Sequence, residues 1–96
     1  MGYVHALQYT PMRVLMQQPP QGLESPRYVS ISLQQDLLGG WLLLRESGLI
    51  GGKSQLKREL FLDTVFAYEA FEKARATHIK KGFQVMFIQG ITEPKT

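Results

Sequence analysis

Three glycines lie within five residues near the middle of the chain, at positions 48, 51 and 52, and the apolar residues Leu49 and Ile50 separate them. Glycine tolerates backbone conformations that a side chain forbids, so such a cluster marks a place where the chain turns sharply. The apolar residues inside the cluster favour a bulged strand edge or a tight bend over a flexible linker. We therefore expect the chain to turn between Gly48 and Gly52, with regular elements before and after the turn.

Two strands are predicted before this bend. Residues 28–33 alternate between apolar side chains on one face and serines on the other, which is typical of a half-buried strand. Residues 36–40 carry the turn chemistry of a hairpin, because their two glycines can adopt positive φ. Residues 41–46 then form the second strand, with Trp41 and Arg45 on the same face.

The segment after the bend, residues 55–62, fits a helix and a strand equally well by its apolar spacing. We favour a strand, because a better helix start lies at Asp63, whose carboxylate can cap free amide groups. A helix is expected from about Asp63 to Lys81, since alanines and Phe71 recur there at helical spacing. Gly82 ends this helix, and residues 83–88 form a last strand.

The first 27 residues are interpreted as an extension outside this pattern. They contain possible short strands at residues 5–9 and 13–16, which Pro11 separates, and a loop at residues 17–26 that three prolines and a glycine punctuate. The expected organisation is an extension at residues 1–27, one α+β domain at residues 28–90 and a tail at residues 91–96.

Composition narrows the class of protein. A chain of 96 residues provides one domain. The absence of cysteine excludes disulfides and thiolate metal sites. No basic region leads into an apolar run, as a signal peptide would require, and no apolar stretch is long enough to span a bilayer. A cytoplasmic protein is therefore expected. Its formal charge of +3 favours acidic partners only mildly.

Residues 47–54 nearly match a phosphate-binding loop, which ends in Lys and Ser or Thr as Lys53 and Ser54 do here. Such a loop lies between a strand and a helix of a parallel sheet, whose βαβ units need about thirty residues each. His5 and His78 are the only histidines, and neither has a second histidine or a carboxylate at ligand spacing. We expect no catalytic residue, no metal and no cofactor, and nucleotide binding is the least favoured alternative.

The order of features from Tyr28 to Phe83 resembles the WGR domain, a family found in DNA-damage-activated poly(ADP-ribose) polymerases and as small bacterial proteins. The family has a D-x-x-G-x-W turn, here residues 36–41, and then an arginine on the second strand, here Arg45. Its name motif, followed by Ile-Gly and later by Gln, corresponds to residues 47–55. An aromatic precedes the family's helix, which contains a prominent alanine and ends in lysine, glycine and an aromatic; here these are Phe61, Ala70, Lys81, Gly82 and Phe83.

The resemblance implies an antiparallel sheet with one helix packed across it, in agreement with the α+β fold predicted from the residues themselves. It also implies a non-catalytic module that binds nucleic acid, DNA rather than RNA, through phosphate contacts. Ser47 and Leu49 stand where the family has Trp and Arg, and Ser54 replaces its later glycine. The predicted nucleic-acid-binding residues are Arg45, Ser47, Leu49, Lys53, Gln55, Lys57, Arg58, Lys80 and Lys81.

A second hypothesis stays open beside nucleic-acid binding. The turn now carries an apolar Leu49 and could present a contact surface for another protein, and the segment at residues 1–16 could pair with a sheet edge. This alternative predicts a protein–protein interaction or homo-oligomerisation module, without a membrane partner.

Overall fold

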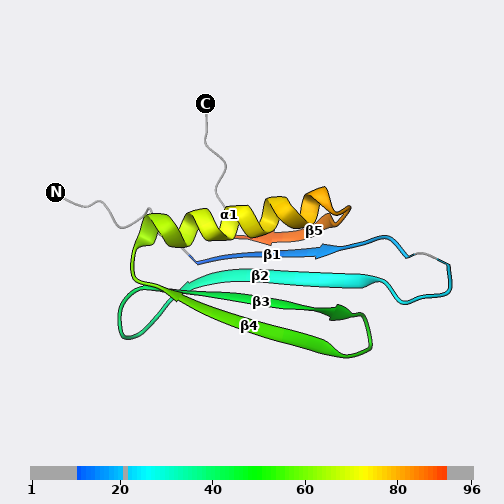
Figure 1. Cartoon of the computed structure of the whole chain (residues 1–96), viewed down its shortest axis with the longest axis horizontal. Helices are drawn as coiled ribbons and strands as arrows, with labels where there is room; N and C mark the ends of the chain where they lie inside the picture. The colour runs from blue at the N-terminus through cyan, green and yellow to red at the C-terminus, as the bar shows by residue number, and fades with distance from the viewer. Residues whose placement is uncertain (1–10, 21, 91–96) are drawn as a thin grey trace.

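The computed structural model describes residues 11–20 and 22–90. Five strands and one helix follow one another in this part of the chain (Figure 1). They are β1 (Met12–Gln17), β2 (Arg27–Gln35), β3 (Trp41–Leu49), β4 (Ser54–Phe61), α1 (Thr64–Lys80) and β5 (Gln84–Gln89). The possible strand at residues 5–9 and the predicted tail at residues 91–96 lie outside the described residues.

The strands form one antiparallel sheet in the order β4-β3-β2-β1-β5, and α1 packs across one face of it (Figure 1). This arrangement confirms the predicted α+β fold. The helix joins the two edge strands, because β4 precedes it and β5 follows it. Its 17 residues span about 25 Å, which suffices to cross a sheet of five strands, about 19 Å wide between its outer strands.

The turn between β2 and β3 is the hairpin that the sequence predicts. The backbone N–H of Asp36 donates to the carbonyl of Gly40 at 3.0 Å, and both Gly39 and Gly40 have positive φ, 102° and 92°. A Cβ atom on Gly40 would lie 2.6 Å from the carbonyl oxygen of Phe61. Glycine is therefore required at position 40 by its conformation and by the approach of β4.

The helix starts and ends within one residue of the predicted limits. Asp63 is the N-cap, and its Oδ1 accepts a hydrogen bond from the Phe66 N–H at 3.0 Å. At the other end Gly82 has a φ of 94°, and the Phe83 N–H donates to the carbonyl of His78 at 3.0 Å. These bonds satisfy backbone groups that a helix end leaves free, which explains why the pattern in the sequence locates both ends.

The core lies between the helix and one face of the sheet. Alternating residues of β1, β2 and β3 point towards α1, as period two requires of strands. The helix contributes Phe71 and two small residues, which let it lie close to the strands. The buried apolar residues are Met12, Val14, Met16, Val29, Ile31, Leu33, Trp41, Leu43, Ala67, Phe71 and Ala74.

Residues 12–17, which belong to the segment interpreted as an extension, lie within the sheet. β1 pairs with β2 on one side and with β5 on the other, and it buries Met12, Val14 and Met16. The predicted strand at residues 13–16 is thus confirmed and extended by a residue at each end. The domain boundaries themselves stay predictions.

The structure decides between the two predictions for the glycine-rich segment. β3 continues through Gly48 to Leu49, its pairing with β4 is regular, and the turn itself comprises residues 50–52. The segment is therefore a tight bend without a bulge, and Gly48 belongs to the strand before it. The ambiguous segment after the bend is a strand, β4, as predicted.

Candidate functional site

A groove of about 480 Å³ runs along the helix-covered face of the sheet, between α1 and the strands β3 and β4. The helix packs mainly on β2 and β3, and every residue of β4 except Phe61 is exposed, so the sheet extends beyond the helix on this side. Four cationic side chains line the groove against the single carboxylate of Glu59. We call this hollow the basic groove; its cations are Arg45, Lys57, Lys73 and Lys81.

Two of these cations lie directly opposite each other in the sheet. Arg45 of β3 and Lys57 of β4 are register partners, and Arg45 shares the helix-covered face with Trp41 and Leu43. Like charges at directly opposite positions of neighbouring strands repel each other and destabilise a sheet. Neither side chain has an ion-pair partner among the described residues, whose single ion pair joins Arg75 and Glu72 of α1. A bound anion would remove this repulsion.

A second hollow of about 390 Å³ continues the positive surface towards the glycine bend. It shares Ser47 and Gln55 with the basic groove and adds two further cations, Arg27 and Lys53. Phe83 also lines it, and the ring of Phe83 stands edge-to-face with the imidazole of His78, with 5.2 Å between the centroids. The two hollows together place cations, hydroxyl and amide groups and the aromatic rings of Tyr28 and Phe83 along a single surface.

The helix contributes groove residues that the predicted set lacked. Lys73, Thr77 and Lys81 all line the basic groove, and of these only Lys81 was predicted. Their spacing of four residues places them on one face of a helix, and this signal was available in the sequence. His78 also lines the groove, where its Nδ1 lies 2.9 Å from the carbonyl oxygen of Ala74.

The structure divides the nine predicted residues into groups. The basic groove contains Arg45, Ser47, Gln55, Lys57 and Lys81, and the second hollow adds Leu49 and Lys53. Arg58 pairs with Leu44 in the register and lies on the opposite face of the sheet. Lys80, in the last turn of α1, lines neither hollow. The sites of contact stay predictions, but seven of the nine positions share one surface.

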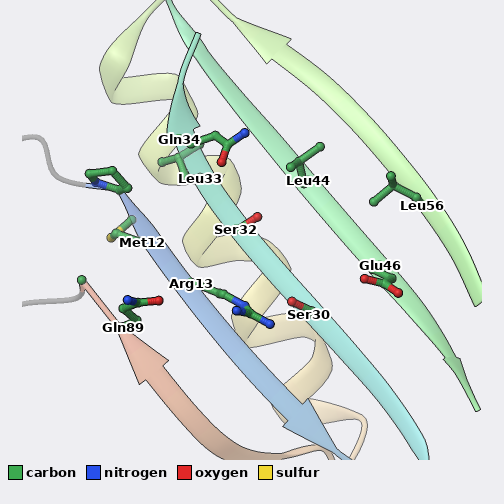
Figure 2. Close-up of a pocket in the computed structure, with 12 residues that line it drawn as sticks. Met12, Arg13, Ser30, Ser32, Leu33, Gln34, Leu44, Glu46, Leu56 and Gln89 are labelled. Carbon is green, nitrogen blue, oxygen red and sulfur yellow. The ribbon is translucent and has the colours of Figure 1, made fainter. Parts of the chain in front are cut away.

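The open face of the sheet carries a different hollow, of about 610 Å³ (Figure 2). In this view the helix lies behind the strands, and Ser30 and Ser32 occupy the middle of the face. The charged residues that line it are Arg13 and Glu46, so its charges balance. This hollow therefore lacks the positive charge that a polyanion would need, and the basic groove is the better candidate site.

A tyrosine near the glycine bend, Tyr28, has a shifted pKa. The Tyr28 hydroxyl donates a hydrogen bond to Oε2 of Glu46 at 2.9 Å. This bond raises the pKa of Tyr28 above its ordinary value of 10.0, because loss of the proton would leave two anionic oxygens in contact. A hydrogen bond involving Ser54 opposes the shift in part. The hydroxyl thus stays protonated at neutral pH.

The structure also bears on the alternative sites that the sequence raised. Residues 47–54, which resemble a phosphate-binding loop, connect two antiparallel strands and not a strand and a helix. In residues 11–20 and 22–90, no three carboxylate or imidazole side chains gather as metal ligands would. No helix in the same ranges has the length and apolar character needed to cross a membrane.

Comparison with protein-family models, with curated proteins and with solved structures found no match to this chain.

Proposed function

We propose that this domain binds nucleic acid through its phosphate backbone, and that the basic groove is the contact surface. The observation that carries the proposal is the direct opposition of Arg45 and Lys57, neither of which forms an ion pair within residues 11–20 and 22–90. Phosphate groups held between these side chains and Lys73 on the helix side would turn a repulsive arrangement into a favourable one.

The remaining lining groups fit this chemistry. Hydroxyl and amide groups, such as those of Ser47, Gln55 and Thr77, donate hydrogen bonds to phosphate and sugar oxygens. Lys53 and Arg27 in the second hollow would hold the next phosphates along a strand. Contacts of this kind position a backbone and read no bases, so the binding should depend little on sequence.

The resemblance of residues 28–83 to WGR domains supports the same function, because that family includes proteins that engage DNA breaks. Part of the resemblance lies at these hollows. Arg45 lines the basic groove, and most of residues 47–55 line the basic groove or the second hollow. The groove has not lost its charge with the replacement of the motif arginine by Leu49, since its cations lie at other positions.

Fluorescence anisotropy with labelled nicked, blunt and single-stranded DNA, and with RNA of matching length, tests the proposal at several salt concentrations. We expect binding at low salt that weakens linearly on a plot of log affinity against log salt. Arg45→Gln and Lys73→Gln should each weaken binding and lower the magnitude of the salt slope by about one.

Arg13→Gln is the matched control, because Arg13 is an exposed strand arginine on the open face of the same sheet. It should leave the affinity for the tightest-binding probe unchanged. Absence of binding at low salt would refute the proposal. Equal losses of affinity in Arg13→Gln and Arg45→Gln would show that nucleic acid is attracted to the protein as a whole. The basic groove would then not be the contact surface.

A further inference from the structure

β4 forms one edge of the sheet, and within the described residues it has a neighbouring strand on one side only. It is eight residues long, contains no proline, and pairs with β3 without irregularity. A straight edge of this length presents unpaired backbone donors and acceptors and is a template for another strand. The edge therefore has an open position for a partner.

The backbone groups that point outward can be identified from the hairpin. The Leu49 N–H donates to the carbonyl of Lys53 at 3.2 Å, which fixes where the alternation of the β3–β4 ladder begins. Residues alternate between facing β3 and facing away from it in an antiparallel ladder. The N–H and C=O groups of Leu56, Arg58 and Leu60 therefore point away from β3.

Charges on an edge strand usually prevent indiscriminate pairing. The charges of β4 make one antiparallel self-pairing complementary. With Arg58 at the two-fold axis, Lys57 lies opposite Glu59 of the second copy, and Leu56 lies opposite Leu60. The same register forms two Lys–Glu pairs and two Leu–Leu pairs, each of which stabilises neighbouring strands.

The two adjacent registers fit less well. An axis at Lys57 opposes this lysine to itself and places Leu56 against Arg58, whereas an axis at Glu59 opposes two glutamates and places Leu60 against Arg58. The favoured register has a like-charge contact at Arg58 only, and these side chains lie exposed in water on the open face, where repulsion is weak.

The exposed leucines of β4 would also favour pairing through the hydrophobic effect. Leu56 and Leu60 are each 53% exposed and lie on the open face of the sheet. Figure 2 shows Leu56 beside Leu44 of the neighbouring strand on this face. In the favoured register each leucine would meet the leucine of the second copy and lose part of its exposed apolar surface.

We propose that β4 is a self-association surface, and that its partner is β4 of a second copy of this chain, antiparallel and centred on Arg58. Residues opposite each other in such a pair share a face of the sheet. The two helices therefore lie on the same side of a continuous ten-stranded sheet, with both basic grooves between them. In the dimer Lys57 would pair with Glu59 of the second copy, so the phosphate contacts of each groove would be made by Arg45, Lys73 and Lys81.

Analytical ultracentrifugation of the unmodified chain, without nucleic acid, is the first test. A surface made of one strand pair is at the small end of protein interfaces, so we expect a reversible monomer–dimer equilibrium that shifts with concentration. Amide hydrogen exchange should slow at Leu56, Arg58 and Leu60 as the dimer forms. A chain that stays monomeric up to its solubility limit would overturn the proposal.

A charge exchange tests the register. Lys57→Glu and Glu59→Lys, made separately, turn both complementary pairs into repulsive ones and should each weaken dimerisation about tenfold or more. An equimolar mixture of the two variants restores both pairs and should form heterodimers. A single chain that carries both substitutions should dimerise as the unmodified chain does.

Lys80→Glu is the matched control, because it makes the same change of charge at an exposed lysine far along the chain in the last turn of α1. It should leave the dimerisation constant unchanged. Arg58→Gln removes the like-charge contact at the axis and should tighten the dimer. A mixture of Lys57→Glu and Glu59→Lys that remains monomeric, or a loss of dimer in Lys80→Glu, would overturn the proposed register.

Discussion

Gly48 and Ser54 lie directly opposite each other in the β3–β4 ladder, and a Cβ atom on Gly48 would lie 2.8 Å from the Cα of Ser54. The same atom would collide with the carbonyl oxygen of Lys53. Both of these neighbours are backbone atoms of the hairpin, so a side chain at position 48 can be accommodated only by separating the two strands.

Gly48→Ala should therefore destabilise the protein by about 3 kcal/mol, because the clash is with backbone that cannot rotate away. Urea unfolding followed by circular dichroism measures the change. Gly52→Ala is the control: its Cβ would lie 3.2 Å from the Cβ of Leu49, a milder approach than the one at Gly48, and its cost should stay below about 1 kcal/mol. Equal losses in the two variants would contradict the close approach at Gly48.

Phe71 is the largest fully buried side chain and connects α1 to the sheet. Phe71→Ala should lower the free energy of unfolding by about 3–5 kcal/mol, through lost burial and the cavity that remains. Phe66, on the same helix, is 61% exposed, and Phe66→Ala should cost less than about 1 kcal/mol. Chemical denaturation of both variants compares them, and a similar cost at both positions would be inconsistent with this placement of the helix.

The N-cap at Asp63 predicts a smaller effect. Asp63→Ala removes the acceptor of the Phe66 N–H and should cost about 1 kcal/mol, whereas Asp63→Asn keeps an acceptor and should cost less. Thermal unfolding of both variants measures the difference. If alanine and asparagine behave alike, the hydrogen bond at this position contributes nothing.

The Tyr28–Glu46 hydrogen bond predicts a dependence on alkaline pH. The folded pKa of Tyr28 lies above the unfolded value of 10.0, so the stability linked to its proton is fully present below that value. This stability is lost as the pH rises through the folded pKa. The stability difference between the unmodified chain and Tyr28→Phe should be constant at about pH 7 to 9 and should shrink towards about pH 11.

Glu46→Gln provides the control for this prediction, because it keeps an acceptor for the hydroxyl and removes the charge that opposes ionisation. The variant should show a smaller loss of stability over the same alkaline range. Urea midpoints of the unmodified chain and of both variants, measured across the pH series, give these stability differences. A difference between the unmodified chain and Tyr28→Phe that is independent of pH would rule out the raised pKa.

Much of the local structure could be predicted because it depends on neighbours in sequence. Alternation marked β2, the glycines of the hairpin turn marked the start of β3, the carboxylate of Asp63 marked the start of α1, and Gly82 marked its end. Each of these signals is complete within a few residues, since period two, capping and positive φ are properties of short segments.

Other features depend on distant parts of the chain, which the sequence patterns do not relate to one another. Residues 13–16 were interpreted as a possible strand in an extension, and in the structure β1 lies between β2 and β5. Arg58 and Lys57 are neighbours in sequence but lie on opposite faces, and Arg58 was therefore grouped with residues that it does not accompany. A cluster of basic residues in sequence does not show which of them share a surface.

The amino-acid sequence by itself determined a sharp change of direction at the glycines, the hairpin, the helix and an α+β class, because short-range sterics and hydrogen bonds specify these elements. Only the tertiary structure decided that Arg45 lies opposite Lys57, that Lys73 and Lys81 face them from the helix, and that β4 is an open edge. These features arise from the order of strands in the sheet and from the path of α1 across it. Both depend on burying one common core, which no single segment of the sequence encodes.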